Sequence, residues 1–96
     1  MHVIPALAHQ ISRGEALIHD AKMVGDAQDH RLWQMRRATW VSHTVDALAP
    51  IFDATTLNRF AMTVARYVGG EHFESLPIEL ENLRDGLAML NRPSDQ

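Results

Sequence analysis

The sequence has 96 residues, of which 46% are hydrophobic and 22% are charged, a composition typical of one globular domain. Its formal net charge of −3 argues against a general nucleic-acid binder, which is usually strongly basic. The absence of cysteine excludes disulfides, thiolate catalysis and cysteine-ligated metals. No apolar stretch approaches the roughly 20 residues of a membrane span and the N-terminus lacks signal-peptide features, so we expect a cytoplasmic protein without membrane contact.

The first predicted helix begins near Pro5, a residue favoured in the first turn of a helix. Its apolar positions follow one another in steps of three and four residues and include Leu7, Gly14 and Ile18. A glycine inside a helix costs about 1 kcal/mol relative to alanine, so Gly14 predicts the close approach of another helix. Gly25 is expected to end the helix in a left-handed conformation.

The second predicted helix begins after Asp26, a favourable N-cap, with Asp29 adding negative charge to its first turn. Its apolar face is broad and carries both tryptophans, Trp33 and Trp40, two turns apart. Proline cannot continue a helix, so Pro50 is expected to end or kink this one at the preceding residue.

The third predicted helix follows an N-cap in the segment 53–56 and is expected to end at Gly69-Gly70. A polar connection over residues 71–75 leads to the fourth helix. Five leucines in that helix alternate in steps of four and three residues, which is a two-heptad seam: Leu76, Leu80, Leu83, Leu87 and Leu90. With no alternating strand pattern, the sequence predicts an all-α, four-helix up-and-down bundle that forms one domain over residues 1–93, with a disordered tail at 94–96.

Catalytic and metal-binding patterns are weak. The six histidines are scattered, and none stands four residues from another as two ligands on one helical face would. Ser42 and His43 are adjacent in sequence, but adjacent helical residues diverge by about 100°. The acidic residues around the start of the fourth helix, including Glu79, are explained by the helix dipole. We therefore expect no metal, no cofactor and no enzymatic activity.

The most informative surface candidates are Trp33, Arg36, Arg37 and Trp40 on the second helix. Arg37 lies four residues after one tryptophan and three before the other, so all three share one helical side. Three interpretations remain open: a cation–π contact, a docking patch rich in Trp and Arg, or core tryptophans with outward arginines. Phosphate or nucleic-acid binding by the patch is disfavoured by the net charge.

The leucine seam has two interpretations: it packs inside the bundle, or part of it pairs with a partner helix. On the second interpretation Leu83 and Leu87 join the four residues above as candidate partner-binding residues. The chain carries more apolar helical surface than one small bundle requires, which favours a protein partner, with a homodimer or higher oligomer expected.

Five parts of the chain are similar to a known class of helical modules: Gly14–Ile18, Trp33, Trp40–Leu48, Ile51-Phe52 and Arg59-Phe60. Over roughly residues 4–64 the chain resembles the small helical N-terminal modules that precede effector domains in bacterial antiphage and abortive-infection proteins. In those modules a G-x-x-L helix precedes a helix with a central tryptophan and an L-x-x-I-F ending. The resemblance implies a role in assembly or sensing and no chemistry of its own.

Two function hypotheses follow from the sequence. The first is a non-enzymatic interaction or self-association module of a bacterial defence or toxin system. The alternative is a small phage or mobile-element inhibitor, similar to an anti-CRISPR protein, that blocks a host complex. A DNA-binding regulator is disfavoured, because the connection between the third and fourth helices is longer than the usual turn of a helix-turn-helix motif.

Overall fold

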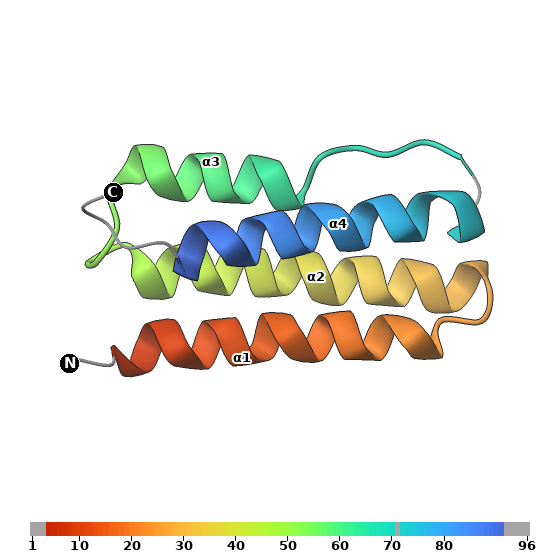
Figure 1. Cartoon of the computed structure of the whole chain (residues 1–96), viewed down its shortest axis with the longest axis horizontal. Coiled ribbons are helices and arrows are strands. Elements are labelled where there is room, and N and C mark those ends of the chain that lie inside the picture. The colour runs from red at the N-terminus through yellow and green to blue at the C-terminus, as the bar shows by residue number, and fades with distance from the viewer. Residues whose placement is uncertain (1–3, 71, 92–96) are drawn as a thin grey trace.

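The computed structural model describes residues 4–70 and 72–91, and in this part of the chain every regular element is a helix. Four α-helices and one short 3-10 helix follow in the order α1 (Pro5–Asp20), η1 (Ala21–Met23), α2 (Ala27–Leu48), α3 (Ala54–Val64) and α4 (His72–Asn91). The predicted all-α, four-helix architecture is confirmed (Figure 1). The predicted tail at 94–96 lies outside the described residues, as do the ends of the predicted domain at 1–3 and 92–93.

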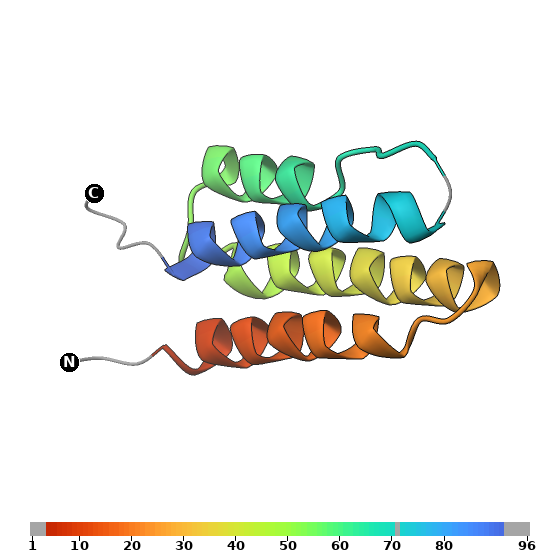
Figure 2. The ribbon, with the colours of Figure 1, turned by 45° about the vertical axis from the view of Figure 1, so that its right-hand side comes forward.

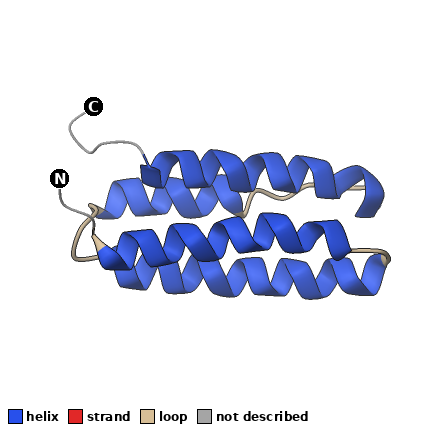
Figure 3. Cartoon of the chain, turned by 60° about the horizontal axis from the view of Figure 1, so that its bottom comes forward, coloured by secondary structure: helices blue, strands red, loops and turns tan. Residues whose placement is uncertain are grey.

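The helices run alternately up and down the long axis of a bundle measuring 41 × 21 × 20 Å. Each helix packs beside the next, and α4 closes the arrangement against α1 (Figures 1 and 2). Figure 3 shows the same four helices from another side, joined at the ends of the bundle by short connections and one longer connection between α3 and α4. The up-and-down topology expected from the sequence is therefore the observed one.

Asp26 caps α2 as predicted, and Asp53, which lies in the segment 53–56 expected to hold an N-cap, caps α3. Asp26 Oδ1 accepts a hydrogen bond of 2.8 Å from the Asp29 amide, and Asp53 Oδ1 accepts one of 2.6 Å from the Thr56 amide. These side chains satisfy amide groups that have no partner within the first turn of a helix. The expected left-handed conformation at Gly25 is wrong: Gly70, with φ of 100°, is the glycine with a positive φ in the described part of the chain. The chain leaves α1 through the 3-10 turn η1 instead.

The boundaries of α3 and α4 differ from the predicted ones. α3 ends at Val64, short of the predicted Gly69-Gly70, and α4 already begins at His72, inside the segment expected to be a connection. Val68 stands four residues after Val64, and this helical spacing is the reason why the third helix was predicted to continue to Gly69-Gly70. In the structure Val68 lies half-buried in the non-helical connection 65–70. As a result α3 is much shorter than the helices on either side of it.

The core lies between all four helices and is centred on Trp40, Phe60 and the buried leucines of α4, which are Leu83, Leu87 and Leu90. The rings of Trp40 and Phe60 meet edge to face at 5.5 Å between centroids. A Cβ added to Gly14 would stand 2.6 Å from Cζ2 of Trp40, so the predicted close helix approach at Gly14 is confirmed. Leu83 and Leu87 are buried, and the leucine seam therefore packs inside the bundle.

Candidate functional site

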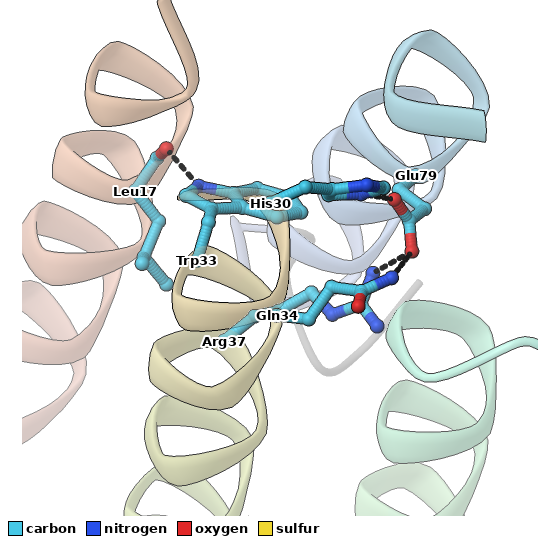
Figure 4. A network of polar contacts seen from close by, with 6 residues as sticks. All are labelled: Leu17, His30, Trp33, Gln34, Arg37 and Glu79. Atoms are coloured by element: carbon cyan, nitrogen blue, oxygen red, sulfur yellow. Dashed lines mark hydrogen bonds and ion pairs between the residues drawn. The ribbon is translucent and has the colours of Figure 1, made fainter. Parts of the chain in front are cut away.

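The most concentrated group of polar side chains in the described structure surrounds the carboxylate of Glu79 on α4, a side chain that is only 3% exposed. Its partners are His30, Gln34 and Arg37, which all come from α2 (Figure 4). These three positions are separated by four and three residues, so they lie on one side of the helix. We call these four residues the Glu79 cluster.

Both carboxylate oxygens of Glu79 have partners. Oε1 lies 2.5 Å from Nε2 of His30, while Oε2 accepts a hydrogen bond of 2.6 Å from Nε2 of Gln34. Oε2 also forms an ion pair with Nη1 of Arg37 at 3.3 Å. One carboxylate thus joins three side chains of α2 to α4, as Figure 4 shows.

The short α3 explains where the cluster can form. Val64, the last residue of α3, packs on Gly86 of α4. Glu79 precedes Gly86 by seven residues, which is about 10 Å along an α-helix, so it lies beyond the end of α3. At that level α2 and α4 meet through polar side chains. Nη1 of Arg37 and Nδ2 of Asn82 are also buried there, without hydrogen bonds to other described residues.

The two tryptophans attach α2 to α1 on the other side of the cluster. The indole N–H of Trp33 donates to the Leu17 carbonyl, and that of Trp40 to the Gln10 carbonyl, both at 2.8 Å. The guanidinium of Arg37 lies 5.5 Å from the ring centroid of Trp33, within the range of a cation–π contact. The cation–π interpretation holds, and the tryptophans are core residues as a second interpretation expected. The outward arginine of that second interpretation is wrong for Arg37, which turns inward to pair with Glu79.

The six predicted partner-binding residues do not form one surface. Trp33, Trp40, Leu83 and Leu87 are buried in the core, because their apolar area packs against neighbouring helices. They are therefore not accessible to a partner in this conformation. Arg37 is directed inward and is 12% exposed beside Glu79. Arg36 alone among the six is exposed.

The cluster has limited chemical capacity. A histidine paired with a carboxylate occurs in hydrolytic triads, but His30 and Glu79 are 6% and 2% exposed, which leaves no room for a substrate. Among the described residues no three His, Asp or Glu side chains gather as a metal site would require. What the arrangement does is fix α2 against α4, since a buried charge must keep its partners.

Sequence reasoning missed Glu79 because its acidic neighbours made a helix-dipole explanation sufficient. A signal was nevertheless present. Glu79, Leu83, Gly86 and Leu90 follow one another in steps of four, three and four residues, which places the glutamate in a buried stripe. A carboxylate in such a stripe requires a partner, and α2 offers polar side chains at matching spacing.

Comparisons with known proteins give no relative: no family model, no curated protein and no solved structure matches the chain. The helices of the described residues also include none with the length and apolar character needed to cross a membrane. The site must therefore be interpreted from its own geometry.

Proposed function

We propose that the chain is a non-enzymatic, all-α interaction module that binds protein through the outer faces of its helices. The observation that carries this proposal is the set of large apolar side chains left on those faces. Met35 on α2 is 65% exposed and Met62 on α3 is 66% exposed, with Leu32 and Ile78 also exposed. Methionine adapts its shape to a partner at low cost, which suits it to binding surfaces.

The burial of the Glu79 cluster supports the same proposal. Its ionisable and polar groups are used to hold α2 on α4, and they are buried. Groups that bind one another in the interior are poorly placed to act on a substrate. The outer faces are what the folded chain presents to other molecules.

The proposed setting is a bacterial defence or toxin system, and it rests on the resemblance to helical modules ahead of effector domains. That resemblance implies a role in assembly or sensing. A nucleic-acid partner is disfavoured by the net charge of −3. The partner is therefore proposed to be protein.

The test is recovery of partners from a bacterial lysate by the tagged full chain, with mass spectrometry and light scattering on the eluate. Two surface variants are compared with the natural chain, one carrying Leu32→Gln and Met35→Gln, the other Met62→Gln and Ile78→Gln. Thr39→Gln with Ser42→Gln is the matched control, since both residues are exposed and polar. All variants should keep their helical circular dichroism.

We expect the natural chain and the control to retain a stoichiometric protein, foreign or identical, and one apolar-to-polar variant to lose it. The proposal would be contradicted if the natural chain retained nothing. It would equally be contradicted if both surface variants retained the same protein as fully as the control does.

A further inference from the structure

Charge is segregated between α3 and α4. Residues 54–70 contain Arg59 and Arg66 and no Asp or Glu, although the whole chain has more acidic than basic residues. Neither arginine forms an ion pair with a described residue. On the described part of α4 the exposed charged side chains are the acidic Glu74, Glu81 and Asp85 and the basic Arg84, so acidic groups outnumber basic ones there. A cationic segment, formed by α3 and the connection after it, therefore lies beside a helix whose exposed side chains carry a net negative charge.

These charges turn to the same side of the bundle. Phe60 and Val64 of α3 face Gly86 of α4. Arg59 directly precedes Phe60, and Asp85 directly precedes Gly86. Because α3 and α4 are antiparallel and both right-handed, the residues that precede two facing residues turn toward the same side of the pair.

Glu81 and Ile78 precede Asp85 by four and seven residues on α4, so helical periodicity keeps them near this side. Arg66 lies beyond the end of α3, in the connection 65–70, and is placed on this side by the hollow that it lines together with Arg59. Met62 lies between the two arginines and is exposed. An open hollow of about 810 Å³ follows α3, and Arg59, Met62 and Arg66 are among its lining residues. We call this surface the α3–α4 face; it consists of Arg59, Met62, Arg66, Ile78, Glu81 and Asp85.

We propose that the α3–α4 face is self-complementary and that two copies of the chain associate through it. A twofold axis parallel to the helices places α3 of each copy over α4 of the other, so the cationic side meets the anionic side twice. Symmetric dimers of this kind use the same patch on both subunits. The inference rests on the proposed function, and it names the partner as a second copy.

The positions of the charged residues along the bundle axis, which we call their level, fit this pairing. Arg66 follows Val64 by two residues, and Val64 is level with Gly86. A twofold axis along the helices preserves that level, so Arg66 comes to lie opposite Glu81 and Asp85 of the partner subunit. Met62 and Ile78 supply apolar area at the same contact. A bundle 41 Å long and 21 Å wide offers a face comparable to the roughly 800 Å² per partner that stable interfaces bury.

A polyanion is a poorer occupant of this face. Glu81 and Asp85 lie beside the arginines, and their carboxylates would repel the phosphates of DNA or RNA. A second copy uses both charges, whereas a nucleic acid uses one and is opposed by the other. The mixed charge of the face is what selects a second copy.

The decisive experiment is a charge swap followed by light scattering on the full chain across micromolar to millimolar concentrations. Arg66→Glu alone and Asp85→Arg alone each place like charges together twice in a symmetric dimer. Mixing the two variants restores opposite charges at both contacts of a heterodimer. Arg36→Glu is the matched control, because Arg36 is an exposed arginine on α2, outside this face.

We expect the natural chain and Arg36→Glu to reach twice the chain mass of 10.8 kDa, and each single variant to fall to one chain mass. The equimolar mixture should regain the doubled mass, and salt should weaken the natural dimer. A natural chain that stays monomeric, single variants that still dimerise, or a mixture that stays monomeric would overturn the inference. So would a monomer that binds duplex DNA through Arg59 and Arg66.

The two proposals fail in different ways. A monomeric chain that still retains a foreign protein through its exposed apolar side chains would overturn the dimer and leave the interaction module standing. A chain that is monomeric and retains nothing would overturn both. Circular dichroism of each variant separates loss of association from loss of fold.

Discussion

Gly14 on α1 lies directly against the indole ring of Trp40 on α2. A Cβ at this position would stand 2.6 Å from Cζ2 of Trp40 and 2.7 Å from Cδ2 of Leu87. Trp40 cannot easily retreat, because its N–H is bonded to the Gln10 carbonyl and its ring packs on Phe60. We therefore expect Gly14→Ala to lower the free energy of unfolding by about 1–3 kcal/mol in urea denaturation, despite the better helix propensity of alanine.

Gly25→Ala is the control for that substitution. A Cβ at Gly25 would meet nothing closer than Oδ2 of Asp29 at 3.7 Å, and its φ is not positive. The midpoint of its unfolding should stay close to that of the natural chain. Equal stability of the Gly14→Ala and Gly25→Ala variants would show that α1 and α2 are not as closely packed at Gly14 as described.

Glu79 should be the most sensitive acidic residue of the chain. Replacing it with alanine leaves the half-buried guanidinium of Arg37 and the buried ring of His30 without their shared partner. Removing one member of a buried ionic group costs about 3–5 kcal/mol. We expect Glu79→Ala to lose most of its cooperative thermal transition, whereas Glu15→Ala, at an exposed position on α1, should melt like the natural chain.

Arg36 and Arg37 are neighbours with opposite roles. Arg37 stacks on Trp33 and pairs with Glu79, while Arg36 is exposed. Arg37→Ala should therefore destabilise the fold by about 0.5–2 kcal/mol from the cation–π contact alone, and Arg36→Ala by less than about 0.5 kcal/mol. Arg37→Glu should be worse than Arg37→Ala, because it sets a second carboxylate beside a buried one. Equal denaturation midpoints for Arg36→Ala and Arg37→Ala would contradict this assignment.

The fold could be predicted from the sequence because the capping residues, helix-ending residues and apolar spacing all indicated the same four helices. Asp26 and Asp53 cap helices, Pro50 ends one, and Gly14 marks a close crossing; each of these is decided within a few residues or by a single spacing. The end of α3 could not be predicted from the sequence. Val68 keeps the helical period beyond Val64, and nothing nearby in sequence states that the chain leaves the helix there.

The candidate site was harder because its parts are far apart along the chain. Glu79 meets residues 42 to 49 positions away, and sequence spacing cannot tell which helix will face it. The predicted patch failed for a related reason. Trp and Arg are enriched in interfaces, but both can also be buried inside a fold, where a tryptophan needs a hydrogen-bond acceptor and an arginine needs an acidic partner. Here α1 supplies the acceptors and α4 supplies the carboxylate.

The indole protons of Trp33 and Trp40 should exchange slowly with solvent. Both donate to backbone carbonyls of α1, and both rings are nearly fully buried. Exchange then requires opening of the α1–α2 contact. We expect two protected indole signals in NMR spectra recorded in heavy water, together with blue-shifted tryptophan emission. Rapid loss of both signals would contradict the placement of α1 on α2.

Asp53 gives the fold a defined response to acid. The backbone amide and the side chain of Thr56 donate hydrogen bonds that hold the pKa of Asp53 below its ordinary value, with a smaller contribution from the charge of Arg59. A carboxyl group whose pKa is lower in the folded than in the unfolded chain stabilises the fold when ionised. That stabilisation is fully present above the unfolded value of about 3.9 and is lost as pH falls through the folded pKa.

The comparison that isolates this effect is the natural chain against Asp53→Asn, measured by urea denaturation at a series of pH values. Asparagine can still cap α3 but does not titrate, and all other acids contribute equally to both proteins. We expect the natural chain to exceed the variant in stability near neutral pH, and the difference to shrink as pH falls below about 4. A difference that stays constant with pH, or that grows in acid, would show that the Asp53 carboxylate does not act through its charge at the start of α3.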